Sequence, residues 1–130
     1  MRILIESIAH EEQRYDTCGD WFESAGPLTL HFARGPTLRV VVSALTDERE
    51  MLLLAVHELI EAILCQHAGV SARTVDEFDL HFKGAGEPGD DPLSPYYAHH
   101  QFATHIEREV ADLLGVDWDA YGKHIEELNR

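Results

Sequence analysis

The stretch MLLLAVHELIEAILC, residues 51–65, holds three ionisable side chains among twelve apolar ones. His57 and Glu61 are four residues apart, so on a helix both side chains can reach one metal ion. Glu58 lies about 100° away around such a helix and is free to act as a base on a water held by that ion. This spacing predicts a water-activating metal site, with His57 and Glu61 as ligands and Glu58 as the catalytic base.

The same stretch predicts that these three groups are secluded from bulk water. A helix that is apolar on all sides is usually buried, and a buried carboxylate is costly unless something compensates its charge. No Lys or Arg lies between residues 50 and 72, so a divalent cation is the economical compensation. The other interpretation is a His–Glu cluster that only forms hydrogen bonds in the interior.

A catalytic metal site needs a third protein ligand and keeps one position open. The later stretch SPYYAHHQFATHIEREVADLL, residues 94–114, offers several candidates. His100 lies at the edge of its apolar face and is the predicted third ligand. Glu107 follows two turns later on that edge, as an outer carboxylate or a fourth ligand. His99 is a reserve ligand, although its place near the middle of the face is more typical of a core histidine, and His105 points to solvent.

Other polar residues offer weaker candidates. Asp76 and Asp79 in VDEFD are three residues apart, which suits ligands or outer-sphere partners, and suits equally a pair that caps or solvates a short helix. Cys18 lacks an activating basic neighbour, and Cys65 sits in the apolar run as a small buried hydrophobe. Asp90, in the loop GEPGDDP, is expected to be solvated.

The elements that position these groups begin with strands. Residues 2–9 suggest a first strand or the start of a helix, and residues 15–27 carry turn chemistry. Residues 28–33 alternate as a half-buried strand does, and residues 37–45 are rich in β-branched side chains. A Gly-Pro turn between these two segments predicts a hairpin.

Helices follow the strands. One is expected from a cap at Thr46 or Asp47, with Glu50 completing a capping box from Asp47, to about residue 68. A short helix or turn is expected at 71–82, a loop at 83–95, and a second long helix from Ser94 to Gly115. A weaker last helix is interrupted by Gly122. The order predicts an α+β fold, with a small antiparallel sheet packed on two long helices and a short C-terminal helix.

The composition of the chain limits the classes of partner that it can bind. The 130 residues fit a single domain, 1–130, and 24 acidic against ten basic residues give a formal charge of −14. That balance disfavours nucleic acid, because phosphate binding needs Lys and Arg. No apolar run reaches the roughly 20 residues that span a membrane, and the N-terminus lacks a signal peptide's features. We therefore expect a cytoplasmic protein with neither a membrane nor a nucleic-acid partner.

Two resemblances extend these predictions. HELIE, residues 57–61, resembles the active helix of zincin-type metallopeptidases, with a glutamate in place of the second histidine. This implies a zincin-like fold and a zinc ion, although a carboxylate ligand also suits Mn²⁺ or Mg²⁺. The wider pattern YDTCGDW, VHELIEAILC, VDEFD and SPYYAHHQFATHIER is similar to small uncharacterised proteins encoded by phages and prophages, a resemblance that implies no activity.

Three functions are compatible with these features. The first is a metal-dependent hydrolase, such as a peptidase, acting on a peptide or small molecule. The second follows from Glu58-x-x-Glu61 and Asp76-x-x-Asp79, which resemble the carboxylates of Mg²⁺-dependent all-α nucleotide pyrophosphohydrolases; the expected hairpin counts against it. The third is a non-enzymatic acidic phage protein that binds a basic host protein, which the apolar setting of Glu58 and Glu61 disfavours.

Overall fold

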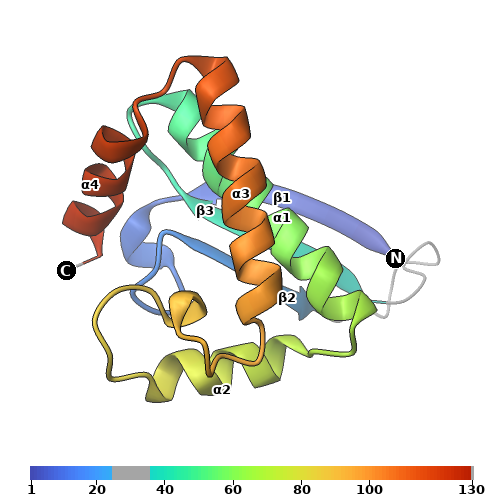
Figure 1. The fold of residues 1–130 in the computed structure, drawn as a ribbon. Coiled ribbons are helices and arrows are strands. Elements are labelled where there is room, and N and C mark those ends of the chain that lie inside the picture. The colour runs from blue at the N-terminus through green and yellow to red at the C-terminus, as the bar shows by residue number, and fades with distance from the viewer. Residues whose placement is uncertain (25–35, 130) are drawn as a thin grey trace.

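The computed structural model describes residues 1–24 and 36–129 of the chain. Within these residues, three strands precede four α-helices (Figure 1), and two short 3-10 helices lie between the first two strands and between the second and third α-helices. The elements are β1 (Arg2–Ile8), η1 (His10–Glu12), β2 (Gly19–Ser24), β3 (Thr37–Ser43), α1 (Glu48–His67), α2 (Ala72–His81), η2 (Pro88–Asp90), α3 (Tyr97–Leu114) and α4 (Trp118–Leu128). This order confirms the predicted α+β class.

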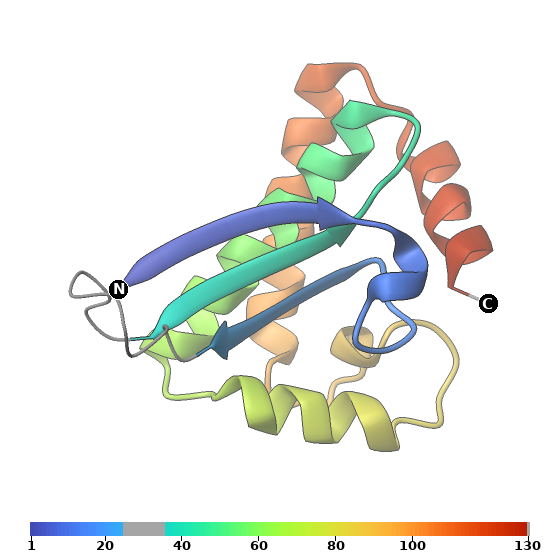
Figure 2. The same ribbon diagram turned by 180° about the vertical axis from the view of Figure 1, so that it is seen from behind.

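The sheet is mixed and not purely antiparallel. Its strand order is β1-β3-β2, in which β3 pairs parallel with β1 and antiparallel with β2. The segment between β1 and β2 contains η1 and reverses the chain, so β2 returns on the far side of β3 (Figure 2). Because β3 runs opposite to β2, it runs in the direction of β1. The register pairs Ile5 with Val40 and Trp21 with Val40.

The strand β2 corrects the prediction of a turn at residues 15–27. Gly19 and Asp20 are typical turn residues, but both have tertiary partners here. Asp20 is buried and accepts hydrogen bonds from Arg14 at 2.7 and 3.0 Å, and Gly19 lies against the side chain of Glu58. The strand predicted at 37–45 is confirmed over β3, whereas the one predicted at 28–33 lies outside the described residues.

Helix α1 is the middle layer of the molecule. It packs on β2 and β3 on one side and on α3 on the other (Figures 1 and 2). Alternate residues of β3 point into this interface, and the core contains the following buried side chains: Cys18, Trp21, Leu38, Val40, Val42, Leu53, Leu54, Ala62, Cys65, Val75, Tyr96, Ala111 and Tyr121. Helix α3 and the sheet therefore enclose the polar residues of α1.

The ends of α1 follow its capping residues. The Asp47 side chain accepts a hydrogen bond from the Arg49 backbone N–H at 2.9 Å, and Gly69 takes a φ of +77° just beyond the last turn. The predicted capping box is wrong, because the Glu50 carboxylate contacts His124 Nδ1 at 2.7 Å. That contact ties the start of α1 to α4.

The later helices differ from the prediction at two points. Helix α3 begins at Tyr97, because Ser94 Oγ accepts a hydrogen bond from the Tyr96 backbone N–H in a turn before the helix. It ends where predicted, at Gly115 with a φ of +70°. Helix α4 continues unbroken through Gly122, since one exposed glycine costs only about 1 kcal/mol.

The apolar surface of α1 is not completely covered. Leu52 and Ile63 are 57% and 45% exposed, so one stripe of the helix remains in solvent. Within residues 1–24 and 36–129, no single helix is long and apolar enough to cross a membrane. Helices α1 and α2 meet that length and composition only as a pair, with a bend of 117° between them.

Candidate metal centre

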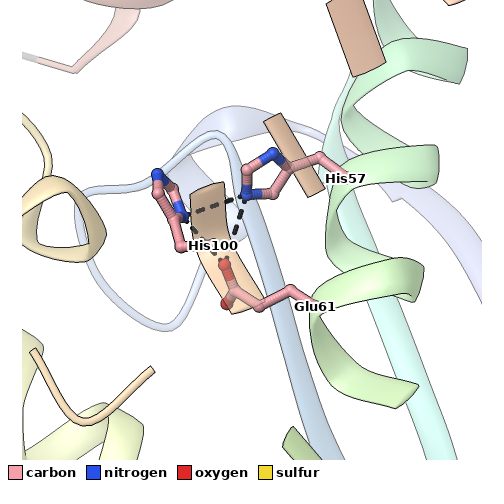
Figure 3. A group of neighbouring side chains, drawn as sticks. All are labelled: His57, Glu61 and His100. Carbon is pink, nitrogen blue, oxygen red and sulfur yellow. Dashed lines mark hydrogen bonds and ion pairs between the residues drawn. The ribbon is translucent and has the colours of Figure 1, made fainter. Parts of the chain in front are cut away.

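The three predicted ligands converge between α1 and α3 (Figure 3). His57 and Glu61 project from successive turns of α1, and His100 faces them from the first turn of α3. All three are buried, with exposed fractions of 7%, 5% and 5%. The His57 Nε2, Glu61 Oε2 and His100 Nδ1 atoms form a triangle with sides of 3.2, 3.2 and 2.9 Å.

The outer nitrogen of His57 is held by α3 and α4. His57 Nδ1 lies 2.9 Å from Glu107 Oε2, and the hydroxyl of Tyr121 donates to Glu107 Oε1, also at 2.9 Å. A carboxylate only accepts hydrogen bonds, so Nδ1 of His57 carries the proton. In the neutral ring, Nε2 then presents a lone pair to the triangle.

The outer nitrogen of His100 faces two carboxylates of the loop before α3. His100 Nε2 lies 3.3 Å from a carboxylate oxygen of Glu87 and 3.3 Å from one of Asp90. Its proton therefore belongs on Nε2, and the neutral ring directs the Nδ1 lone pair inward. The second oxygen of Glu61 is occupied too, because the Trp21 indole N–H donates to Oε1 at 3.0 Å.

Lone pairs of two nitrogens and one oxygen thus point toward the centre of the triangle. With neutral imidazoles, His57 Nε2, His100 Nδ1 and Glu61 Oε2 all face each other as acceptors, and such acceptors repel unless a proton or a cation lies between them. Outer partners that hold each ligand in this orientation are typical of metal sites, where the second ring nitrogen of a histidine donates to a carboxylate. The arrangement requires either protons or a metal ion.

The pKa directions describe the state in which protons fill the site. Burial lowers the pKa of His57, but hydrogen bonds to Glu107 and Glu61 outweigh it and raise that pKa well above its ordinary value. Burial likewise opposes protonation of His100, whose contacts with Glu61 and Glu87 raise its pKa to about 9. The two imidazoles overcome burial at Glu61 and lower its pKa to about 2.

Glu58 lies beside the triangle but outside it. Glu58 is partly buried as a residue, and its carboxylate approaches the backbone of β2 so closely that a Cβ on Gly19 would lie 2.5 Å from Glu58 Oε1. It takes no part in the hydrogen bonds that join the other site residues in the described chain. Burial, followed by the charge of Glu61, raises its pKa well above the ordinary value.

The remaining candidates lie apart from the triangle. His99 is only partly buried, and so does not occupy the core, and His105 is exposed. The Asp76 carboxylate contacts Arg14 at 3.2 Å, and Asp79 accepts a hydrogen bond from the Tyr96 hydroxyl. Burial raises the pKa of Asp79 to about 6.

Several contacts at the site could not be predicted from the sequence. The bulk of Trp21 in YDTCGDW suggests a wall of the pocket, but the hydrogen bonds that Trp21 and Tyr121 donate to the carboxylates leave no spacing signal. Glu87 and Gly89 contact His100 from an irregular loop, and Asp90, expected to be solvated, joins them. The proline, glycines and acids of that loop predict either a lid or simply a loop, but not its contact with the third predicted ligand.

Comparisons of the chain with models of protein families, with curated proteins and with solved structures find no match. The resemblances to zincins and to phage-encoded proteins therefore stay predictions. Any function has to be argued from the site itself.

Proposed function

We propose that the chain is a metal-dependent hydrolase in which His57, Glu61 and His100 bind a divalent cation, with zinc as the best fit. The observation that carries the proposal is the convergence of three buried acceptor atoms. Carboxylates beside the far ring nitrogens of His57 and His100 keep the imidazole protons there, so neutral rings offer no proton to the other acceptors of the triangle. Two imidazole nitrogens and one carboxylate oxygen form a donor set found in catalytic zinc sites.

The spacing of the donor atoms fits such an ion. Tetrahedral zinc bound at about 2.0–2.1 Å places neighbouring donor atoms about 3.3 Å apart, and the distances here are 2.9–3.2 Å. The donor set holds three protein ligands, which is the number that leaves a fourth position for water. When bound, the ion would supply an acidified water and polarise a substrate carbonyl.

Glu58 is the proposed base. It follows the ligand His57 directly, its carboxylate is free of the hydrogen bonds that occupy Glu61 and Glu107, and its raised pKa suits a group that accepts a proton. Its task would be to remove a proton from the water and return it to the leaving group. The substrate class proposed is a peptide or another small carbonyl compound.

The two other functions gain no support from specific contacts. A pyrophosphohydrolase would need Asp76 and Asp79 beside Glu58 and Glu61, but the two aspartates are engaged by Arg14 and Tyr96, and the chain carries a sheet. A non-enzymatic acidic protein that binds a basic host protein would need its acids in rows at the surface, whereas Glu61 is buried.

Elemental analysis tests the metal site. Protein purified without chelator or affinity metal should carry about one zinc per chain, and His57→Ala should lose it. Glu58→Gln should keep the zinc while hydrolysis of p-nitrophenyl acetate or of a fluorogenic peptide falls about 100-fold. Glu48→Gln, at an exposed position of the same helix, is the matched control. Wild-type protein without metal after incubation with zinc would refute the proposal.

A further inference from the structure

We propose that the loop Glu87–Asp90 clamps His100 in the position and tautomer that the metal site needs. Glu87, Gly89 and Asp90 are then positioning residues of that site. This inference rests on the proposed function, since it assigns a role within the proposed site. It goes beyond the proposed function because these residues do not belong to the predicted ligand set and contact His100 at its outer nitrogen and at its ring face.

Two carboxylates define the tautomer. The His100 side chain is 7% exposed, whereas those of Glu87 and Asp90 are each 57% exposed, so the acids reach inward from the surface to a buried ring. Both lie 3.3 Å from Nε2 and neither can donate. The contact therefore favours the ring with its proton on Nε2 and its free electron pair on Nδ1.

Gly89 fixes the ring from its face. A Cβ at this position would lie 2.4 Å from His100 Cγ and 2.5 Å from Nδ1, distances at which the ring would have to move. The φ of Gly89 lies outside the left-handed region, unlike that of Gly86 at +81°. Glycine is therefore needed at position 89 for space and not for backbone conformation.

The clamp is tied to the helix that carries His100. The Gln101 side-chain amide donates to Asp90 Oδ1 at 2.9 Å, one residue beyond the ligand. Pro88 restricts the backbone at the start of the 3-10 turn. The loop and the first turn of α3 consequently hold the imidazole between them.

The first experiment removes the acceptor charges and keeps the shapes. The double variant Glu87→Gln/Asp90→Asn should bind zinc about 10- to 100-fold more weakly than wild type in competition with a chromophoric chelator. The control Glu109→Gln/Asp112→Asn removes two charges from exposed positions of α3. If the double variant and the control have equal affinities, the clamp is refuted.

A second measurement needs no metal and tests the contact at Nε2, since the metal-free ring carries a proton on both nitrogens at pH 7. In metal-free protein at pH 7, the Nε2–H proton of His100 should be protected from solvent and give a resolved NMR signal. Exchange should broaden that signal away in the double variant but not in the control. If wild-type protein binds no zinc, yet the signal is lost in the double variant and kept in the control, the proposed function fails and the clamp stands. If the signal is the same in both variants, the clamp fails.

Gly89→Ala tests the contact with the ring face. We expect at least a tenfold loss of zinc affinity, with a shift of the His100 ring resonances, and no such loss for Gly122→Ala, where a Cβ meets nothing within 4 Å. A folded Gly89→Ala protein with wild-type zinc affinity would contradict the proposal. If Gly89→Ala does not fold, the carboxylate pair decides the question.

Discussion

Raising the pH of the metal-free protein should weaken its fold between about pH 6.5 and pH 9. His100 has a folded-state pKa of about 9 against an ordinary value of 6.5, so the folded state holds the proton more tightly than the unfolded chain. The resulting stability is fully present below pH 6.5 and is lost as the pH rises through 9. A difference of about 2.5 pKa units corresponds to about 3 kcal/mol in the free energy of unfolding.

Zinc should reverse the sign of this dependence. Metal ligands must lose their protons before they bind, so in a fixed excess of zinc the stability should rise with pH between 5.5 and 7.5. Urea titrations across this pH range, with chelator and with zinc, measure both slopes. His100→Gln should reduce the metal-free slope without abolishing it, because the pKa of His57 is raised as well, whereas His105→Gln, at an exposed position of the same helix, should leave it unchanged. Parallel slopes with and without zinc would refute the reasoning.

The outer partners of the site give further predictions. Glu107→Gln should lower zinc affinity about 10- to 100-fold, because an amide is a weaker acceptor for the imidazole N–H; Glu109→Gln, measured in the same chelator competition, should have no such effect. Gly19→Ala should leave zinc affinity within about threefold but abolish hydrolysis, because its Cβ would displace the Glu58 carboxylate; unchanged hydrolysis would exclude Glu58 as the base. Gly122→Ala, which contacts nothing, should raise the free energy of unfolding by about 0.5–1 kcal/mol in urea titrations.

The local part of the site could be predicted from the sequence. Helix α1 has a strong signal, because its apolar run, its cap at Asp47 and its stop at Gly69 all agree, and the i, i+4 spacing of His57 and Glu61 fixes their relation within it. The edge position of His100 on an amphipathic helix was enough to choose it over His99. In each case, helical periodicity determined where a side chain points.

The tertiary part could not be predicted in the same way. The strand at 19–24 was hidden because Gly19 and Asp20 are typical turn residues, and their partners, Glu58 and Arg14, are recognisable only in the fold. The parallel pairing of β1 with β3 depends on the path of the irregular connection between β1 and β2, and an irregular segment has no periodic sequence pattern that predicts its path. Trp21 likewise joined the site through pairing of its strand with β3.

The proposed ligands are separated along the chain, which has a consequence for the order of assembly if they bind a metal. His57 and His100 are 43 residues apart, and only His57 and Glu61 share a helix. A newly synthesised chain that has formed α1 alone offers a metal two donors, too few to hold it against cellular chelators. The ion would therefore be acquired after α3 has docked, so that metal content reports completed folding, and protein produced in zinc-poor medium would accumulate folded and ready to be filled.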